Sequence, residues 1–186
     1  MKETGTESPL SREQEESLLR LARQAITQYL QEGTYPDMET DDAMFKQKRG
    51  AFVTLKVNNQ LRGCIGYPIP HMSLYETIID AAISAATKDF RFPTLQKEEL
   101  RDTQIEISVL TLPTVVKDIS EIEVGKHGII ITQGANRGLL LPQVPVEWGW
   151  DRETFLRHGC LKAFLDEDAW KKGAQIEIFS AQVFAE

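Results

Sequence analysis

Apolar residues recur every three or four positions after the first ten residues, a spacing that predicts an amphipathic helix. Ser11 and Gln14 have the spacing of a capping box, and Gly33 provides a stop signal, so we expect the helix to lie between them. Residues 1–10 lack this pattern and are expected to form a flexible tail. The recurring apolar positions are Leu18, Leu19, Ala22, Ala25, Ile26, Tyr29 and Leu30.

A β-hairpin is predicted next, because two strand-like runs flank the dipeptide Asn58-Asn59. The runs are GAFVTLKV at 50–57 and QLRGCIGY at 60–67. Side chains two positions apart on a strand share a face, so we expect Arg62 and Cys64 on the same face. Gly63 and Gly66 are typical of a bulge or of a close approach between backbones.

The middle of the chain predicts a helix over 73–88, capped by Ser73, and a strand over 103–112. Small residues dominate one part of that helix, which would let it lie close to a sheet. The strand alternates apolar with polar residues and should be half-buried. These features rest on Ala81, Ala82, Ala85 and Ala86 in the helix, and on Ile105, Ile107 and Val109 in the strand.

The last third predicts a second hairpin, a helix and a final strand. KHGIIIT and RGLLLP flank QGAN, Asp151 can cap a helix reaching about Leu165, and QIEIFSAQVF at 175–184 is strand-like. An apolar helix stripe made of Leu156, Cys160, Ala163 and Phe164 places Cys160 in the core. Because neighbouring strands are joined by short turns, we expect an α+β fold with mainly antiparallel sheets and packed helices.

Composition narrows the class of protein. The chain has 186 residues, 41% of them hydrophobic and 26% charged, which is typical of a globular protein. No apolar run approaches the roughly 20 residues of a membrane span, and the polar, acidic amino-terminal stretch is unlike a secretory signal. We therefore expect a cytoplasmic protein with no membrane contact. The net charge of −7 disfavours nucleic acid as a partner but leaves room for a local basic pocket.

Two cysteines occur, Cys64 and Cys160, without the spacing of a zinc site or a redox pair, so no metal or cofactor is expected. Cys64 has two interpretations. It is either a small buried residue beside glycines that serve the backbone, or a reactive thiolate activated by Arg62 with nearby amide groups as an oxyanion site.

Other residues are candidates for the same site. His127, at the start of a strand, is the best candidate for a base, although a lone histidine at such a position more often has a capping or surface role. Arg62 and Arg91 could together clamp a carboxylate or phosphate, and Asp89 could help bracket the ligand. Alternatively each guanidinium pairs with a nearby carboxylate. Gln143, after Pro142, could hydrogen-bond a ligand or cap a turn.

Five motifs in order make the chain resemble the AMMECR family over roughly residues 13–184. They are LRGCIG at 61–66, DFRFP at 89–93, KHGIIIT at 126–132, GLLLPQV at 138–144 and FLRHGCLKAFL at 155–165. The resemblance implies a single AMMECR-type domain over 11–186, with a smaller subdomain within about 113–150. It also implies two unequal subdomains with a groove between them, and partners of the Memo-like and radical-SAM kinds, as in the AmmeMemoRadiSam system.

The sequence departs from the family pattern at two phenylalanines. Phe90 stands where the loop motif usually has proline, and Phe164 stands where the last helix usually has glycine. The resemblance implies no settled chemistry. Our first hypothesis is a ligand-binding or adaptor protein that takes a small anionic or peptide-like ligand near Arg62, Gly63, Cys64, Gly66, Asp89, Arg91 and Gln143. The alternative is a cysteine-dependent transferase or hydrolase, with Cys64 as nucleophile and His127 as base.

Overall fold

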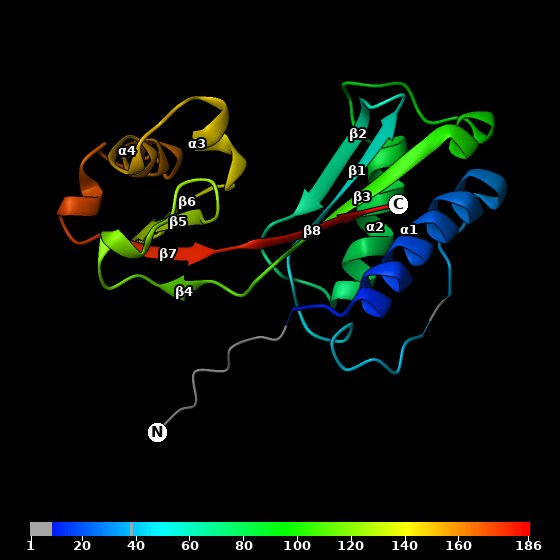
Figure 1. Cartoon of the computed structure of the whole chain (residues 1–186), viewed down its shortest axis with the longest axis horizontal. Helices are drawn as coiled ribbons and strands as arrows, with labels where there is room; N and C mark the ends of the chain where they lie inside the picture. The colour runs from blue at the N-terminus through cyan, green and yellow to red at the C-terminus, as the bar shows by residue number, and fades with distance from the viewer. Residues whose placement is uncertain (1–8, 38) are drawn as a thin grey trace. The chain divides into compact units, whose positions relative to one another are not determined.

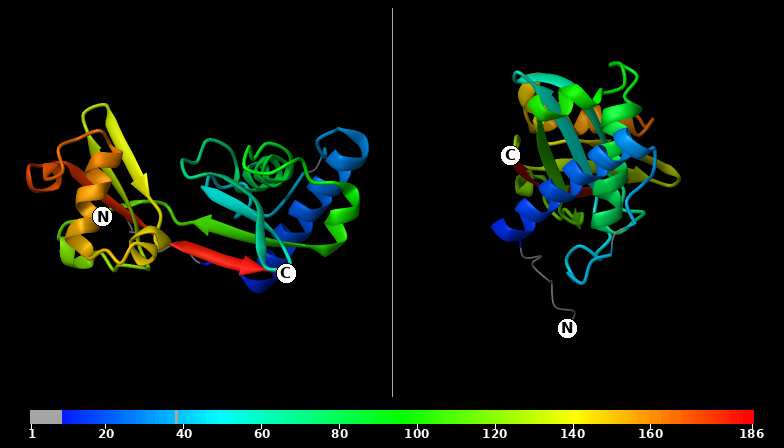
Figure 2. Two further views of the ribbon diagram at one scale, coloured as in Figure 1. Left: turned by 90° about the horizontal axis from the view of Figure 1, so that it is seen from above. Right: turned by 90° about the vertical axis from the view of Figure 1, so that its right-hand side faces the viewer.

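The computed structural model describes residues 9–37 and 39–186, in which the chain forms two compact units. Unit 1 comprises Met1–Leu110 and Gln182–Glu186, and unit 2 comprises Thr111–Ala181. Each unit holds one four-stranded sheet and helices packed against it (Figures 1 and 2). The predicted α+β fold with mainly antiparallel sheets is confirmed.

Unit 1 follows the predicted order of elements. Its sheet has the strand order β2-β1-β3-β8, so β2 and β8 are the edge strands. The 3-10 helix η1 (Lys97–Asp102) leads into β3. The other elements are α1 (Arg12–Glu32), β1 (Ala51–Val57), β2 (Gln60–Tyr67), α2 (Leu74–Thr87), β3 (Thr103–Leu110) and β8 (Ala181–Ala185).

Local sequence signals account for the ends of these elements. Ser11 caps α1 in a capping box with Gln14, and Gly33 ends it in the left-handed region at a φ of 73°. Ser73 and Glu76 form the same box at α2. Asn58 and Asn59 both have positive φ, 51° and 61°, which suits the tight turn between β1 and β2.

Both helices of unit 1 pack against its sheet (Figure 1). They bury the inward side chains of β1 and β3. Those inward residues are Ala51, Val53, Leu55, Ile105, Ile107 and Val109, all fully buried. Burying a large aliphatic side chain of this kind contributes about 1.5–3 kcal/mol. The predicted inward face of the 103–112 strand is confirmed, although the strand ends at Leu110.

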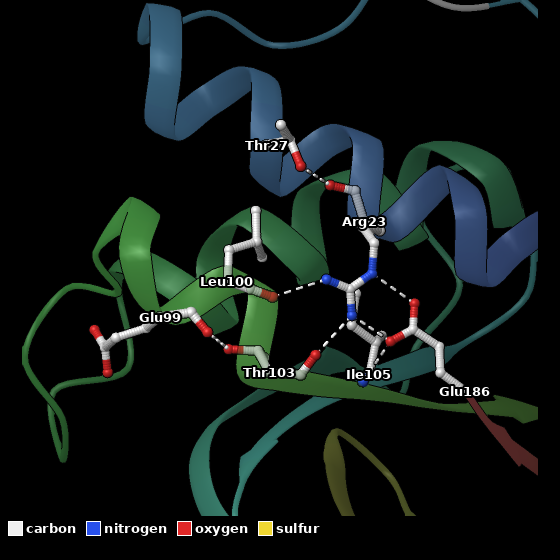
Figure 3. Close-up of polar contacts among 7 residues, drawn as sticks. All are labelled: Arg23, Thr27, Glu99, Leu100, Thr103, Ile105 and Glu186. Carbon is white, nitrogen blue, oxygen red and sulfur yellow. Dashed lines mark hydrogen bonds and ion pairs between the residues drawn. The ribbon is translucent and has the colours of Figure 1, made fainter.

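Arg23 joins α1 to the start of β3 and to the residue that follows β8 (Figure 3). Its guanidinium donates to the carbonyl oxygens of Leu100, at 2.9 Å, and Thr103, at 2.6 Å, and pairs with the Glu186 carboxylate. Glu186 also accepts the backbone N–H of Ile105 at 3.2 Å. These bonds connect α1, η1, β3 and the segment after β8.

The tail predicted over 1–10 lies mostly outside the described residues. Of its last residues, Leu10 is buried. The side-chain amide of Gln182 holds the Leu10 backbone, accepting its N–H at 2.8 Å and donating to its carbonyl at 3.0 Å.

Unit 2 contains the predicted second hairpin, β5 and β6, in a sheet of order β4-β7-β5-β6. Helix α4 covers one face of β5 and β6 (Figure 1), and Asp151 caps it as predicted. Two 3-10 helices, η2 (Ile119–Glu121) and η3 (Ala169–Lys171), complete the unit. The remaining elements are β4 (Thr114–Val115), β5 (Gly128–Gln133), β6 (Asn136–Leu140), α3 (Gln143–Glu147), α4 (Arg152–Lys162) and β7 (Gln175–Phe179).

Two predictions about the last third of the chain are wrong. The single strand expected over 175–184 is two strands, β7 and β8, which belong to different sheets and are separated at Ser180. Helix α4 ends at Lys162, before Phe164. Phe164 has a left-handed backbone conformation and is 90% exposed, so it does not belong to the apolar stripe. Cys160 is fully buried in the core of unit 2, as predicted, and burial raises the pKa of its thiol.

Candidate functional site around Cys64

A bulge at Arg62 determines which residues lie opposite Cys64. A two-residue turn would pair Leu55 with Arg62, but the register shifts there and pairs Leu55 with Gly63 and Thr54 with Cys64. Leu55 is fully buried, so the unshifted register would direct the Arg62 charge toward the core. The bulge thus places Cys64 opposite Thr54, whereas the unshifted register would place it opposite the fully buried Val53. That Arg62 and Cys64 share a face stays a prediction.

Both glycines of the strand motif are in close contact with neighbouring groups. A Cβ on Gly63 would collide with the carbonyl oxygen of Ala85 in α2, and one on Gly66 would collide with the Phe52 ring. The close backbone approach predicted for such glycines is therefore present at Gly63. A ligand-binding role for Gly63 and Gly66 stays a prediction.

Cys64 is a free, half-buried cysteine on the face of the sheet opposite α1 and α2. Its register partner Thr54 donates its hydroxyl to the Cys64 sulfur at 3.3 Å. The fully buried residues of β1 alternate with Thr54, which fixes this face assignment. The thiol is therefore neither a core residue nor fully exposed.

The backbone of Cys64 is held by two side chains of the loop that follows α2. Its N–H donates to Oδ2 of Asp89 at 2.9 Å, and its carbonyl accepts from Arg91 at 3.4 Å. Because β2 is an edge strand, these groups occupy the hydrogen-bonding positions that another strand would use. The LRGCIG and DFRFP motifs therefore form one structural feature.

The Asp89 carboxylate binds both the Arg91 guanidinium and the Cys64 backbone. The Asp89 side chain is 3% exposed and accepts two bonds from the Arg91 guanidinium, at 2.9 Å and 2.7 Å. The Arg91 bonds, with further backbone bonds from Cys64 and Arg91, outweigh burial and hold the pKa of Asp89 far below its usual range. In return Asp89 raises the pKa of Arg91.

Arg62 has a carboxylate partner of its own. Its guanidinium donates to both oxygens of Glu99, at 2.9 Å and 3.0 Å, and to the carbonyl of Pro93 at 2.8 Å. Arg62 lowers the pKa of Glu99. For both Arg62 and Arg91, the interpretation as a local ion pair is therefore the one present in the structure.

The loop between these ion pairs presents a large apolar side chain. Phe90 lies between Asp89 and Arg91 in the sequence, and its side chain is 97% exposed. A single exposed apolar side chain is common at a protein surface, so the position of Phe90 next to the fixed Asp89 and Arg91 is what distinguishes it. The loop that carries it is fixed through both neighbours of Phe90 to the backbone of Cys64.

His127 and Gln143 belong to unit 2, whereas every contact of Cys64 given above comes from unit 1. Nδ1 of His127 accepts the backbone N–H of Glu123 at 3.1 Å. In a neutral imidazole the other nitrogen then carries the proton, so this bond engages the lone pair that a base would use. Gln143 is the exposed first residue of α3.

Sequence reasoning missed three residues of this feature. Thr54 comes opposite Cys64 only because of the bulge. Glu99 lies in a 3-10 helix that no periodicity indicates. Phe90 gave one signal, its departure from the proline of the family motif, but nothing in the sequence indicated the exposure of its ring.

Two further findings concern chemistry that the site could support. Within residues 9–37 and 39–186, no three or more His, Cys, Asp or Glu side chains are grouped so as to hold a metal ion. In the same part of the chain, the helices are too short or too polar to cross a bilayer.

Comparisons with known proteins agree with the motifs and the fold. The AMMECR1 family model matches residues 19–184. Protein MK0488 of Methanopyrus kandleri is 48% identical over 187 residues, covering 95% of this chain and 90% of its own length. Protein MJ0810 of Methanocaldococcus jannaschii is 47% identical over 177 residues, covering 90% and 88%.

A solved structure is also similar. The crystal structure of the uncharacterized protein PH0010 from Pyrococcus horikoshii has a TM-score of 0.75 and 43% identity, and the match covers 92% of this chain and 90% of that one. With the family model matching most of the sequence, the chain belongs to the AMMECR1 family.

Proposed function

We propose that the protein is a ligand-binding or adaptor component that works with Memo-like and radical-SAM proteins in the cytoplasm. The observation that carries this proposal is the exposed Phe90 ring on a loop fixed to Cys64 by the Asp89–Arg91 ion pair. An aromatic side chain on a fixed loop suits recognition, because the loop backbone loses little conformational entropy when a partner covers the ring.

The ion pairs favour a peptide-like ligand over a small anion. Arg62 and Arg91 each bind a carboxylate through two bonds, so a small anion would have to compete with Glu99 and Asp89. A peptide can contact the Phe90 ring and the half-buried Cys64 without displacing either carboxylate. The net charge of −7 gives no reason to add nucleic acid to the partners.

The test is co-purification of the protein with the Memo-like and radical-SAM proteins of the same organism, all three well folded. Phe90→Ala should reduce capture of the partner about tenfold, as expected when an exposed aromatic contact residue is removed. Phe164→Ala is the matched control, because it removes a phenylalanine that is 90% exposed in unit 2. Absence of any complex, or loss of capture with Phe164→Ala alone, would refute the proposal.

A cysteine-dependent transferase or hydrolase is the second candidate function. The observation in its favour is the Thr54 hydroxyl, which donates to the Cys64 sulfur and would stabilise a thiolate. A nucleophilic cysteine also needs a base, and the Nδ1 of His127 is already bonded to Glu123. We therefore place the adaptor function first.

A further inference from the structure

Unit 1 contains a cavity that no residue of the LRGCIG and DFRFP motifs lines. It has a volume of about 260 Å³ and lies between α1, the segment around Glu39–Phe45 and the start of α2. This volume is just below the ~300–1,000 Å³ typical of ligand pockets, so it would admit a molecule smaller than a nucleotide.

The cavity has an apolar floor. Leu21 and Phe45 are buried and line it together with the half-buried Tyr75. Two phenyl-type rings and one aliphatic side chain favour an aromatic or large aliphatic group in the space between them.

Two side chains of opposite charge line the cavity together with this floor. Arg20 lines the cavity from α1, and Glu39 lines it from the segment after α1. Arg20 has a side chain that is 67% exposed, with Glu16 at a distance of 3.9 Å, so its guanidinium keeps donors available. Burial and the nearby acidic residues Glu76, Asp37 and Glu39 raise the pKa of Tyr75, in agreement with a negative potential around this side chain.

Hydrogen bonds hold the cavity walls together in the absence of a ligand. Gln14 of α1 donates to Asp42 at 2.9 Å, and the Tyr75 N–H of α2 donates to the carbonyl of Phe45 at 3.2 Å. Asp42 is therefore fixed to α1 and Phe45 to α2, so this wall of the cavity is preformed. A preformed site loses less entropy on binding than a site that must be ordered.

We propose that this cavity binds a free amino acid with a large apolar side chain, with the side chain on the Leu21, Phe45 and Tyr75 floor. Arg20 binds the carboxylate of the ligand, and Glu39 binds its ammonium group. The inference does not depend on the proposed function, because it uses none of the residues around Cys64.

Titration calorimetry of the full chain with L-phenylalanine, L-tryptophan, L-leucine and L-methionine tests the inference. We expect at least one to bind with a dissociation constant of about 1 mM or tighter, as the size of such ligands allows. L-Alanine, which lacks the large apolar group, should bind at least tenfold more weakly. A tenfold difference in the dissociation constant is about 1.4 kcal/mol of binding free energy. Failure of all four large amino acids to bind would overturn the inference.

Two variants test which residue binds the carboxylate of the ligand and which binds its ammonium group. Arg20→Gln should weaken binding of the preferred amino acid about tenfold, and should weaken its deaminated analogue but not its decarboxylated analogue. Glu39→Gln should show the opposite pattern. Arg12→Gln is the matched control, since Arg12 lies on α1 with a side chain 91% exposed and does not line the cavity. All three positions are exposed, so folding should be retained, and equal losses for Arg20→Gln and Arg12→Gln would also overturn the inference.

Discussion

The backbone N–H of Cys64 donates to the buried carboxylate of Asp89 at 2.9 Å, which joins the edge strand β2 to the loop after α2. Arg91 completes the connection by pairing with Asp89 and donating to the Cys64 carbonyl. Two side chains thus replace a neighbouring strand at this point of the sheet edge. An edge strand covered in this way is protected from pairing with another chain.

Replacing Asp89 with asparagine should therefore destabilise the protein. Asparagine keeps the shape of the side chain, but its neutral amide cannot form the ionic bonds that the buried Asp89 carboxylate makes with Arg91. Hydrogen bonds to charged groups contribute about 1.5–3 kcal/mol, so we expect the free energy of unfolding in urea to fall by about this amount. Asp102→Asn is the control, because Asp102 is exposed and its contact with Arg101 is 3.4 Å long. A similar loss in both variants would contradict the special role of Asp89.

The contribution of Asp89 should also depend on pH in a defined direction. Its pKa is lower in the folded protein than in the unfolded chain, where it is about 3.9. The stabilisation is therefore fully present above the unfolded value and is lost as the pH falls below it. The difference in unfolding free energy between the natural protein and Asp89→Asn should shrink steadily between about pH 5 and about pH 2. A difference that stays constant over this range would contradict the assignment.

Gly63→Ala tests the contact between β2 and α2. The added methyl group would collide with the backbone carbonyl of Ala85, which cannot move without shifting the helix. Overpacking of a core usually costs about 1–3 kcal/mol. Because the group in the way is a backbone carbonyl, we expect the free energy of unfolding to fall by an amount at or above the upper end of this range. Urea unfolding measures the loss, with Gln60→Ala at the exposed start of the same strand as control. An unfolding free energy within about 0.5 kcal/mol of the natural protein would contradict the contact.

The two cysteines should differ sharply in reactivity. Cys64 is half-buried, whereas Cys160 is fully buried and its thiol pKa is raised by burial. Iodoacetamide should therefore modify Cys64 in the folded protein and Cys160 only after unfolding, as measured by peptide mass spectrometry. Equal labelling of both in the folded state would contradict the placement of Cys160.

Thr54→Val tests the contact of the Thr54 hydroxyl with the Cys64 sulfur. Valine has nearly the same shape but removes the hydrogen-bond donor to the sulfur, which should slow alkylation severalfold at fixed pH. Thr87→Val is a comparable control in α2, since the Thr87 hydroxyl bonds only within its own helix. An unchanged rate in Thr54→Val would remove the main support for the cysteine enzyme.

Local signals were enough to predict most elements of the fold. The capping boxes at Ser11 and Ser73 and the Asn58-Asn59 turn act over a few residues, and each element begins or ends where they indicate. The alternation of Ile105 and Ile107 likewise predicted the buried face of β3. Such features depend on neighbouring residues alone, which is why a single sequence reveals them.

The geometry of the candidate site depends on contacts between distant residues. The bulge at Arg62 reflects a conflict between the Arg62 charge and the buried face at Leu55, and this conflict arises only once helices cover the sheet. The carboxylate partners Glu99 and Asp89 follow from the course of the loop. The break at Ser180 has the same origin, since β7 and β8 pair with strands of different sheets. No local pattern encodes these relationships.

Phe164 has an unfavourable backbone conformation, and a substitution can test its cost. It follows the last turn of α4 with a φ of 57°, a conformation that costs a residue with a side chain about 1–2 kcal/mol and costs glycine almost nothing. Its side chain is 90% exposed, so burial does not offset this cost. Phe164→Gly should therefore stabilise the protein by about 1 kcal/mol, and Phe164→Ala should not, because alanine keeps the Cβ that is disfavoured there. Thermal unfolding of the three proteins measures the effect. Equal stability of the glycine and alanine variants would show that the left-handed conformation carries no cost at this position.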